Sequence, residues 1–390
     1  MNLRGKKIVV CVTGSVAAIE TPKLVRELRR LGADIFCVIS KSAKGIIHQD
    51  VLEWASNNKV VTRITGNVEH VKLAGNVPEK ADLIIVAPAT ANTIGKIANA
   101  IDDTAVTTFV TTALGTGIPL IIVPAMHGSM YKHPIVKENI AKLKRINVSF
   151  MQPRVEEGKA KFPPVKSVVE TISNSLAEKD LAGKTILVTA GPTVEAIDSL
   201  RYLTNKSSGK TGVWIADAAV VRGAKVILIR GPTKVEPTQQ MRDIKVNSAK
   251  EMFTAVKKNS KAGIMIHTAA VADYTLKEKQ GKIESGKSFS LKLTPTAKIL
   301  DQVKKWNKKI FLVGFKAEYG VPEKQLVESA FKKLKESKAD LIVANDLKKK
   351  TGGIGHNSNE VYVVDRAKKV RHFGLMHKKD IANKILALVK

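Results

Sequence analysis

The chain has 390 residues, 44% of them hydrophobic, with 65 lysines and arginines against 35 aspartates and glutamates and a formal net charge of +30. This length and apolar content predict two or three folded domains and exclude a disordered chain, and no apolar run reaches the roughly 18–20 residues of a membrane span. The positive charge favours anionic partners, but only 5% of the residues are aromatic and no helix-turn-helix, zinc-finger or RNP-like pattern is present, so we expect small anionic substrates rather than nucleic acid.

The chain starts with a short apolar run, KKIVVCV at 6–12, which is followed by Gly-Ser and a polar helical pattern. A signal peptide needs a longer apolar region and a cleavage site, so we interpret this run as the first strand of a cytoplasmic protein. The two cysteines, Cys11 and Cys37, lie in apolar, strand-like runs, and there is no C-x-x-C motif. This predicts buried thiols in a reducing compartment and argues against a zinc site.

Strand-like and helix-like segments then alternate, which is typical of a parallel sheet covered by helices. In the first half we predict strands at 6–12, 34–40, 82–90 and 118–126 and helices at 18–32 and 90–100. Near residue 180 the same pattern restarts: LAGKTILVTAGPT (181–193) echoes LRGKKIVVCVTGS (3–15), and KADLIVAND (338–346) echoes KADLIIVAPAT (80–90).

The repetition predicts an α/β protein of two domains, each a doubly wound, mostly parallel sheet. The boundary falls in the short polar stretch NSLAEKDLAG (174–183), and we place the domains at 1–178 and 179–390. NEVYVVDRAKKVRHF (359–373) predicts two strands around a polar turn that extend the second sheet.

The stretch TNKSSGKTG (204–212) ends like a Walker A phosphate loop, but Thr204 occupies the position of the first glycine of that motif. The nearest predicted strand, at 184–191, also ends well upstream. The stretch therefore predicts an anion site that is not a Walker loop. In parallel sheets, ligands bind at the carboxyl ends of strands near a switch point, so we expect the site residues in the segments that follow the strands.

Three segments of the first half carry a family resemblance: VTGSVAA (12–18), APATANTIGKIAN (87–99) and PAMHGSMY (124–131). In this order, across 1–165, they resemble the flavin-dependent decarboxylases that act on cysteine carboxylates. The resemblance implies a flavoprotein-type fold with FMN as cofactor. It assigns FMN binding to Gly14, Ser15, Ser40, Thr90 and Asn92.

His70, in VEHVKLAG, matches the active-site histidine of this family. Thiol oxidation by a flavin requires a proton exchange at neutral pH, which an imidazole can provide. The same resemblance assigns His127 and Met130 to the substrate, although His127 stands where the family has an asparagine.

The flap of this half departs from the family. In the bacterial pattern a mobile flap carries a cysteine that returns a proton to the enethiol intermediate, whereas the flap region here, QPRVEEGKAKFPPV (152–165), has none. Either Glu156, Glu157, Lys159 or a water molecule supplies this proton, or this half is slow or inactive.

The second half contains five motifs in a characteristic order: TAGPT (189–193), RYLTNKSSGKTG (201–212), AAVADY (269–274), GFKAE (314–318) and AND (344–346). Across 183–390 they resemble the phosphopantothenate–cysteine ligases and imply a Rossmann-like fold. The whole chain resembles the bifunctional phosphopantothenoylcysteine decarboxylase/phosphopantothenate–cysteine ligases of coenzyme A biosynthesis. The substrates implied are CTP, 4′-phosphopantothenate and cysteine, with Mg2+ as a further cofactor.

In such a ligase a carboxylate attacks the α-phosphate of CTP, and the cysteine amine then attacks the acyl cytidylate, so positioning and cations replace a side-chain nucleophile. The resemblance places Asn205 at the acyl nucleotide and Lys282 at the nucleotide, and Arg201 and Lys210 supply charge near Asn205. The further CTP contacts that it implies are Ala269, Asp273, Thr296, Ala297, Lys298, Ile299, Phe315, Lys333 and Ser337. Ser337 takes the place of a family lysine.

Two alternatives remain: a ligase whose flavin half is degenerate, and a basic nucleic-acid-binding or scaffold protein. A dehydrogenase is disfavoured because neither half shows G-x-G-x-x-G with an acidic residue about 20 positions on. A flavin prenyltransferase would not explain the second half. The family implies a homo-oligomer; the sequence leaves open its size, the preference for CTP over ATP and the metal ligands.

Overall fold

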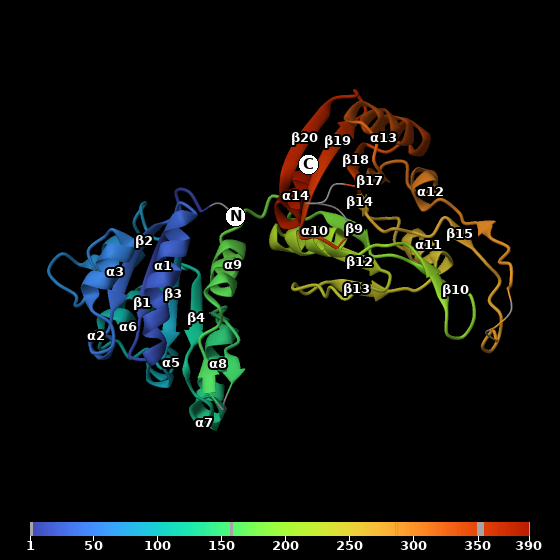
Figure 1. Cartoon of the computed structure of the whole chain (residues 1–390). Coiled ribbons are helices and arrows are strands. Elements are labelled where there is room, and N and C mark those ends of the chain that lie inside the picture. Colours follow the sequence, from blue (N-terminus) through green and yellow to red (C-terminus); the bar gives the residue numbers. More distant parts are fainter. Residues whose placement is uncertain (1–2, 157–158, 285, 287, 349–354, 390) are drawn as a thin grey trace. The chain divides into compact units, whose positions relative to one another are not determined.

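The computed structural model describes residues 3–156, 159–284, 286, 288–348 and 355–389 (Figure 1). The chain divides into two compact units, Met1–Ala177 and Glu178–Lys390, each with its own sheet. No helix in the described ranges is both long and apolar enough to cross a bilayer.

The first unit is built on a five-stranded parallel sheet in the order β2-β1-β3-β4-β6 (Figure 1). The strands are β1 (Lys7–Val12), β2 (Asp34–Ile39), β3 (Leu83–Ala89), β4 (Leu120–Pro124) and β6 (Ser149–Phe150). They are nearly continuous apolar runs, as expected for strands that are covered on both faces. Because the order reverses at β1, the switch point lies between β1 and β3.

Helices cover both faces of this sheet. They are η1 (Val16–Glu20, a 3-10 helix), α1 (Thr21–Arg30), α2 (Lys41–Lys44), α3 (Gln49–Ser56), α4 (Glu69–Ala74), α5 (Ala91–Ala98), α6 (Ala105–Gly115), α7 (Gly128–Lys132), α8 (Pro134–Arg145) and α9 (Val165–Ser175). Alternate residues of β1 enter two cores: Ile8 packs with Leu24 of α1 and Val168 of α9, whereas Val9 packs with Phe109 of α6. The predicted helix at 18–32 is a 3-10 turn followed by α1.

The first unit also contains a small antiparallel sheet in the order β5-β8-β7. It joins β5 (Met126–His127) to the flap hairpin, β7 (Arg154–Glu156) and β8 (Lys159–Lys161). His127 lies opposite Lys159 in the register. The predicted burial of Cys11 and Cys37 is confirmed, and burial raises the pKa of the Cys11 thiol, which keeps it protonated.

The second unit contains an eight-stranded sheet in the order β13-β12-β9-β14-β17-β18-β19-β20. The strands are β9 (Thr185–Ala190), β12 (Lys225–Arg230), β13 (Arg242–Lys245), β14 (Ile264–His267), β17 (Phe311–Glu318), β18 (Leu341–Asp346), β19 (Ser358–Asp365) and β20 (Val370–His377). The first six are parallel and follow the 3-2-1-4-5-6 order of a Rossmann sheet, so the switch point lies between β9 and β14. The predicted hairpin at 359–373 is confirmed as the antiparallel pair β19–β20.

Five helices cover this sheet: α10 (Lys210–Val221), α11 (Ala249–Lys258), α12 (Ile299–Trp306), α13 (Glu323–Ser337) and α14 (Lys378–Leu386). Val188 of β9 packs with α10 and α14 on one face, and Leu187 packs with α11, α12 and α13 on the other. Both units are therefore doubly wound α/β folds, as predicted. Two short hairpins lie outside the main sheet: β10 (Val194–Ala196) with β11 (Tyr202–Thr204), and β15 (Tyr274–Thr275) with β16 (Thr294–Pro295).

Candidate functional sites

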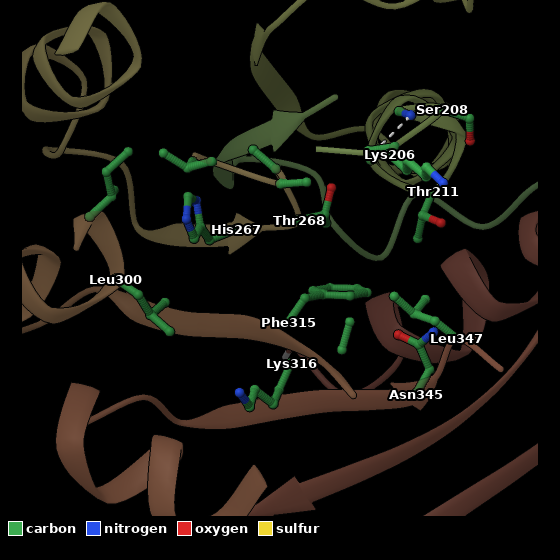
Figure 2. A pocket seen from close by; sticks show the side chains of 18 of the residues that line it. Lys206, Ser208, Thr211, His267, Thr268, Leu300, Phe315, Lys316, Asn345 and Leu347 are labelled. Carbon is green, nitrogen blue, oxygen red and sulfur yellow. Dashed lines mark hydrogen bonds between the residues drawn. The ribbon is translucent and has the colours of Figure 1, made fainter. Parts of the chain in front are cut away.

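A cavity of about 590 Å3 opens at the switch point of the second sheet (Figure 2). Its wall is formed by 206–212, 267–273, 296–300 and 315–317, with Lys333, Glu336, Asn345, Leu347, Asn359, Val361, Lys378 and Ile381. Figure 2 shows Ser208, which precedes α10, and Thr211, in its first turn, on one side, His267 and Leu300 on another, and Phe315 between them. The cavity thus lies where a Rossmann sheet holds its ligands.

The stretch 204–212 forms one wall of this cavity without being a Walker loop. Between β9 and α10 the chain makes the β10–β11 hairpin, so the helix does not follow directly from a strand. Gly209 is the N-cap residue, with φ +71°, and no side chain caps the helix, which argues against a simple capping role for Ser208. A Cβ at Gly212 would lie 2.4 Å from Thr268 Oγ1 and 2.6 Å from Ala190 Cβ, so α10 starts in direct contact with the strand ends.

Asn205 lies next to the cavity wall, where it is hydrogen-bonded to backbone carbonyls of the segment 267–273. Its side-chain Nδ2 donates to the carbonyl oxygens of Ala270 (3.3 Å) and Val271 (3.1 Å), two residues of the cavity wall. Lys210, in the wall itself, donates from Nζ to Gly355 O (2.7 Å) and Asn357 Oδ1 (2.8 Å). The two residues therefore approach the same cavity from one stretch of chain.

The wall assigned to the nucleotide is held by its own ion pairs. Asp273 and Lys298 form one pair, and Lys333 Nζ binds Asp301 Oδ1 at 2.8 Å in another. Thr296 Oγ1 donates to Ala272 O at 2.6 Å, which joins the segment before α12 to the segment after β14. These ion pairs thus hold the charged groups of Asp273, Lys298 and Lys333 in place in the cavity wall.

In the first unit, the turns that follow β1, β2, β3 and β4 meet at one edge of the sheet. Thr13 Oγ1 donates to Pro88 O (2.8 Å) and accepts from Thr90 N (3.1 Å), which ties the β1 turn to the β3 turn at the switch point. Ser40 N donates to Val12 O at 3.0 Å, and Ala125 N donates to Ala89 O at 3.0 Å. Three of these turns end in a side-chain N-cap, formed by Ser15, Ser40 and Thr90.

A second cavity, of about 1200 Å3, lies beside the Ser15 turn within the first unit. Its wall comes from η1, from the start of α1, from 125–127 and from the flap hairpin with the start of α9. The exposed apolar side chains of Val16 and Ile19 belong to this wall, together with His127 and Phe162. An apolar cavity with a few polar groups is typical of a small-molecule site.

His70 lies on α4 and does not contribute to this wall. Its Nδ1 is buried and has no hydrogen-bond partner among the described residues, which is unusual for a polar atom in a folded protein. The helix start is fixed by Glu69, which accepts from Thr65 N (3.0 Å) and from the Thr65 hydroxyl; that hydroxyl bond is the largest cause of the lowered pKa of Glu69.

Comparisons with known proteins agree with both halves of this description. Residues 1–177 match the Flavoprotein family, and residues 181–390 match the family described as DNA/pantothenate metabolism flavoprotein C-terminal domain. The chain is 49% identical, over 98% of its length and 94% of the relative, to the coenzyme A biosynthesis bifunctional protein CoaBC of Thermococcus kodakarensis. It is 38% identical, over 100% of its length and 94% of the relative, to the protein of the same name from Methanocaldococcus jannaschii.

The chain belongs to the CoaBC family. It is therefore a bifunctional protein of coenzyme A biosynthesis. Among solved structures, the C-terminal domain of a CoaBC protein aligns with 55% of this chain and 96% of its own length, at 37% identity and a TM-score of 0.46.

The structure brings most of the predicted ligase residues of this CoaBC protein to one cavity. Those in its wall are Lys210, Ala269, Asp273, Thr296, Ala297, Lys298, Ile299, Phe315 and Lys333. Ser337 is not among them: its side chain is buried, and its hydroxyl donates to Lys333 O at 2.7 Å within α13. That placement speaks against a CTP contact from Ser337.

Arg201 and Lys282 also lie outside the cavity wall, on two segments that bind each other. Arg201 pairs with Asp198 (3.3 Å), and Asp198 accepts a hydrogen bond from Ile283 N (3.1 Å). This bond is the largest cause of the lowered pKa of Asp198. The structure thus places Lys282 next to the Arg201 loop.

In the flavin unit, Gly14, Ser15, Ser40 and Thr90 lie on the joined turns, Asn92 lies in the first turn of α5, and His127 lies in the wall of the larger cavity. Met130 is on the exposed helix α7 and outside that wall. Glu157 and the side chain of Lys159 lie outside the described residues. Glu156, the remaining predicted proton donor, forms ion pairs with Arg154 (2.8 Å) and Lys161 (3.3 Å).

Two cavity residues were missed by the sequence analysis. Lys378, in the first turn of α14, is buried and donates from Nζ to His356 O (2.8 Å); burial, and then Lys210, lower its pKa to about 8. His267 ends β14, and burial lowers its pKa to about 4, with Lys333 as a further cause. The rule that parallel strands present ligand residues at their carboxyl ends could have found His267, but no sequence signal marks Lys378.

His267 is expected to make the ligase unit sensitive to acid. Ala269 N donates to Thr189 Oγ1 (3.2 Å), and the Thr189 hydroxyl can donate to His267 Nδ1 (2.8 Å) when the buried ring is neutral. In the unfolded chain this histidine takes up a proton below pH 6.5, whereas in the folded protein it does so only near pH 4. The free energy of unfolding therefore falls as the pH drops through that window.

For this one histidine, the decrease in the free energy of unfolding approaches about 1.4 kcal/mol per pH unit. Urea unfolding between pH 4 and 7, followed by tryptophan fluorescence, should show a smaller loss in His267→Gln than in the wild type. His356→Gln, which changes an exposed histidine of the same unit, should keep the wild-type slope. Equal slopes in the wild type and His267→Gln would show that this histidine does not cause the effect.

Proposed function

We propose that residues 179–390 join cysteine to 4′-phosphopantothenate with CTP, through an acyl cytidylate, and that residues 1–178 decarboxylate the product with FMN to give 4′-phosphopantetheine. The observation that carries the proposal is the switch-point cavity, whose wall contains nine of the residues assigned to the ligase substrates: Lys210, Ala269, Asp273, Thr296, Ala297, Lys298, Ile299, Phe315 and Lys333. A cavity of about 590 Å3 is in the usual range for a small-molecule site.

In this proposal the ligase residues act by position and charge. Asn205, held at the carbonyls of 270 and 271, orients the acyl group, and the ammonium of Lys210 lies in the same wall. Asp273 and the segment 296–299 bind the nucleotide. Arg201 and Lys282 approach it from the neighbouring loop and supply further positive charge. Such groups stabilise the charge that develops as the carboxylate attacks the α-phosphate and as the amine attacks the acyl carbon.

Mg2+ is proposed to enter with CTP. No group of three or more histidine, cysteine, aspartate or glutamate residues is placed to hold a metal ion in the part of the chain that the structure describes. The cavity wall contains two carboxylates in the described residues: Asp273 is paired with Lys298, and Glu336 lies 3.8 Å from Lys333 Nζ. Mg2+ is usually bound by one or two carboxylates together with substrate phosphates and water, so the residues fit an ion carried by the nucleotide but not a resident metal.

The turns of the first unit fit FMN. The N-caps Ser15, Ser40 and Thr90 place backbone N–H groups of three helix starts at one sheet edge, which suits a phosphate. Gly14 has no room for a side chain, since a Cβ would lie 2.5 Å from Ser42 Cβ. We propose that these residues and Asn92 hold FMN, which when bound accepts two electrons from the substrate and returns them. His70 exchanges the thiol proton, and the second cavity receives the substrate.

The protein is further proposed to work as a cytoplasmic homo-oligomer. Two observations support one alternative: the flap region has no cysteine, and Glu156 forms ion pairs with two cations, Arg154 and Lys161. On that alternative the chain is a ligase with a degenerate flavin half.

One assay distinguishes these functions. Purified protein should be yellow with flavin bands, and with CTP, Mg2+, 4′-phosphopantothenate and cysteine it should form first 4′-phosphopantothenoylcysteine and then 4′-phosphopantetheine with release of CO2. Mass spectrometry of quenched samples would follow both products, and ATP in place of CTP would test the nucleotide preference. The cysteine adduct without CO2 from flavin-loaded protein would establish the degenerate half, and the absence of both products would overturn the proposal.

A further inference from the structure

The wall of the larger cavity in the flavin unit contains His127, a side chain to which the proposed reaction assigns no role. In the proposed reaction, loss of CO2 leaves a carbon–carbon double bond beside the sulfur, and saturating that bond takes one hydride and one proton, which a positioned acid can supply. Histidine is the side-chain type that both holds and releases a proton near neutral pH. In the wall of this cavity, within the described residues, His127 is the one histidine.

His127 is positioned by two independent contacts. Its backbone belongs to β5, where His127 pairs with Lys159 and Met126 pairs with Ala160 of the flap hairpin. It is also the N-cap residue of α7, and its Nδ1 contacts Ser129 N (3.4 Å) and Ser129 Oγ (2.8 Å). The backbone of His127 is therefore held by the flap hairpin and its ring by Ser129 of α7, in the same cavity wall as Ser15 of the flavin turn.

The contacts with Ser129 also select the ring nitrogen that faces a substrate. The Ser129 N–H can only donate, so in the neutral ring its contact with Nδ1 selects the tautomer with a bare Nδ1 and the proton on Nε2. Nε2 makes no hydrogen bond to any residue in the described ranges. The Ser129 hydroxyl can turn to accept from Nδ1 when the ring is charged, so one partner serves both protonation states.

Apart from Glu20, the last residue of η1, the other charged groups in this wall are less suited. Arg154 and Lys161 bind Glu156 from the flap hairpin, and Glu27 of α1 binds Arg30. Lys23 and Lys166 are exposed cations that suit a phosphate rather than proton delivery to carbon.

We propose that His127, as the imidazolium, is the general acid of the decarboxylase half: its Nε2–H donates the proton that saturates the substrate carbon after CO2 has left, and the ring is left neutral. This rests on the proposed function. The C–CO2 bond breaks, and a carbon–carbon double bond remains beside the sulfur because two electrons have gone to the flavin. When those two electrons return as a hydride to one carbon, the proton from Nε2 goes to the other, and the thiol product is complete. Solvent then reprotonates His127 at the exposed cavity.

The test is His127→Asn in the flavin-loaded full chain, with 4′-phosphopantothenoylcysteine as substrate. Asparagine is a good N-cap residue, so α7 should keep its start and the protein should fold. CO2 should still be released in a first turnover, but saturated product should form about 100- to 10,000-fold more slowly, the usual contribution of a general acid. Mass spectrometry should instead detect the unsaturated thiol, two hydrogens lighter than the product, and added imidazole should restore the saturated product.

His133→Asn is the matched control, because His133 is likewise an exposed N-cap histidine whose Nδ1 accepts from a backbone N–H two residues on, at Ile135, but it lies outside the cavity wall. It should behave like the wild type. Calorimetric binding of 4′-phosphopantetheine to the flavin-loaded His127→Asn protein should stay within about twofold of wild type.

Saturated product at the wild-type rate, or a defect that lies only in this binding, would overturn the role of His127 while leaving the proposed function intact. Absence of CO2 from the wild type itself would overturn both.

Discussion

Replacement of His70 by asparagine is expected to abolish decarboxylation, with a loss of about 100- to 10,000-fold in CO2 release, while the ligase rate stays within about twofold of wild type. The reason is chemical: thiol oxidation needs a group that accepts a proton, and an asparagine amide cannot do so at neutral pH. The structure adds that His70 Nδ1 is buried without a partner among the described residues, as a group kept available for a reactant would be.

The ligase is expected to be insensitive because its cavity is built entirely from the second unit, with a separate core. CO2 release and CTP-dependent adduct formation would be measured on the same preparation, with far-ultraviolet circular dichroism as the check of folding. His48→Asn is the control in the same unit, since His48 is an exposed N-cap histidine of α3. Loss of ligase activity in a folded His70→Asn protein, or wild-type CO2 release from it, would contradict the prediction.

Replacement of Asn205 by aspartate is expected to separate the two half-reactions of the ligase. The wild-type amide donates to two carbonyl oxygens, and an aspartate there would face them with a carboxylate that can only accept. It would also repel the oxyanion that develops when the amine attacks the acyl carbon. Loss of such a donor lowers the rate by roughly 100- to 1,000-fold. CTP should still be consumed, because Asp273, Lys298 and the first turn of α10 remain in the cavity wall.

Pyrophosphate should therefore form, and acyl cytidylate should accumulate instead of the cysteine adduct. Mass spectrometry of reactions quenched with and without cysteine would measure both. Asn307→Asp is the matched control: Asn307 Nδ2 also donates to two backbone carbonyls, Ser260 O (3.0 Å) and Ala262 O (3.3 Å), but outside the cavity. It should lower stability without changing the order of products. Adduct formation at the wild-type rate, or no cytidylate at all, would show that Asn205 has another role.

The sequence predicted the two parallel sheets because their strands are buried on both faces and so appear as unbroken apolar runs, such as KKIVVCV and KTILVTAG. It did not predict the hairpin of Val194–Ala196 and Tyr202–Thr204, whose residues are partly exposed and carry no apolar alternation. It also missed the 3-10 turn Val16–Glu20, because helical periodicity does not distinguish one such turn from the first turn of α1.

For the sites, the segments after the strands were predictable, since topology alone brings the ends of parallel strands together. Which residue of a segment faces the cavity was not. Lys333 and Ser337 are one helical turn apart on α13, yet Lys333 reaches the cavity and the Ser337 hydroxyl is used by the helix itself. The pairing of His127 with the flap strand depends on a register between segments about 30 residues apart, which no local pattern encodes.

The antiparallel hairpin β19–β20 returns the chain so that the first turn of α14, with Lys378 and Ile381, completes the wall of the ligase cavity. During synthesis on a ribosome, every other part of that wall emerges before α14 does. The growing chain can therefore finish the flavin unit early, whereas the nucleotide cavity stays open on one side until α14 has been released from the exit tunnel. A ribosome that stalls between residues 346 and 378 would display a folded first unit and an incomplete ligase, exposing the apolar face of α10 that α14 normally covers.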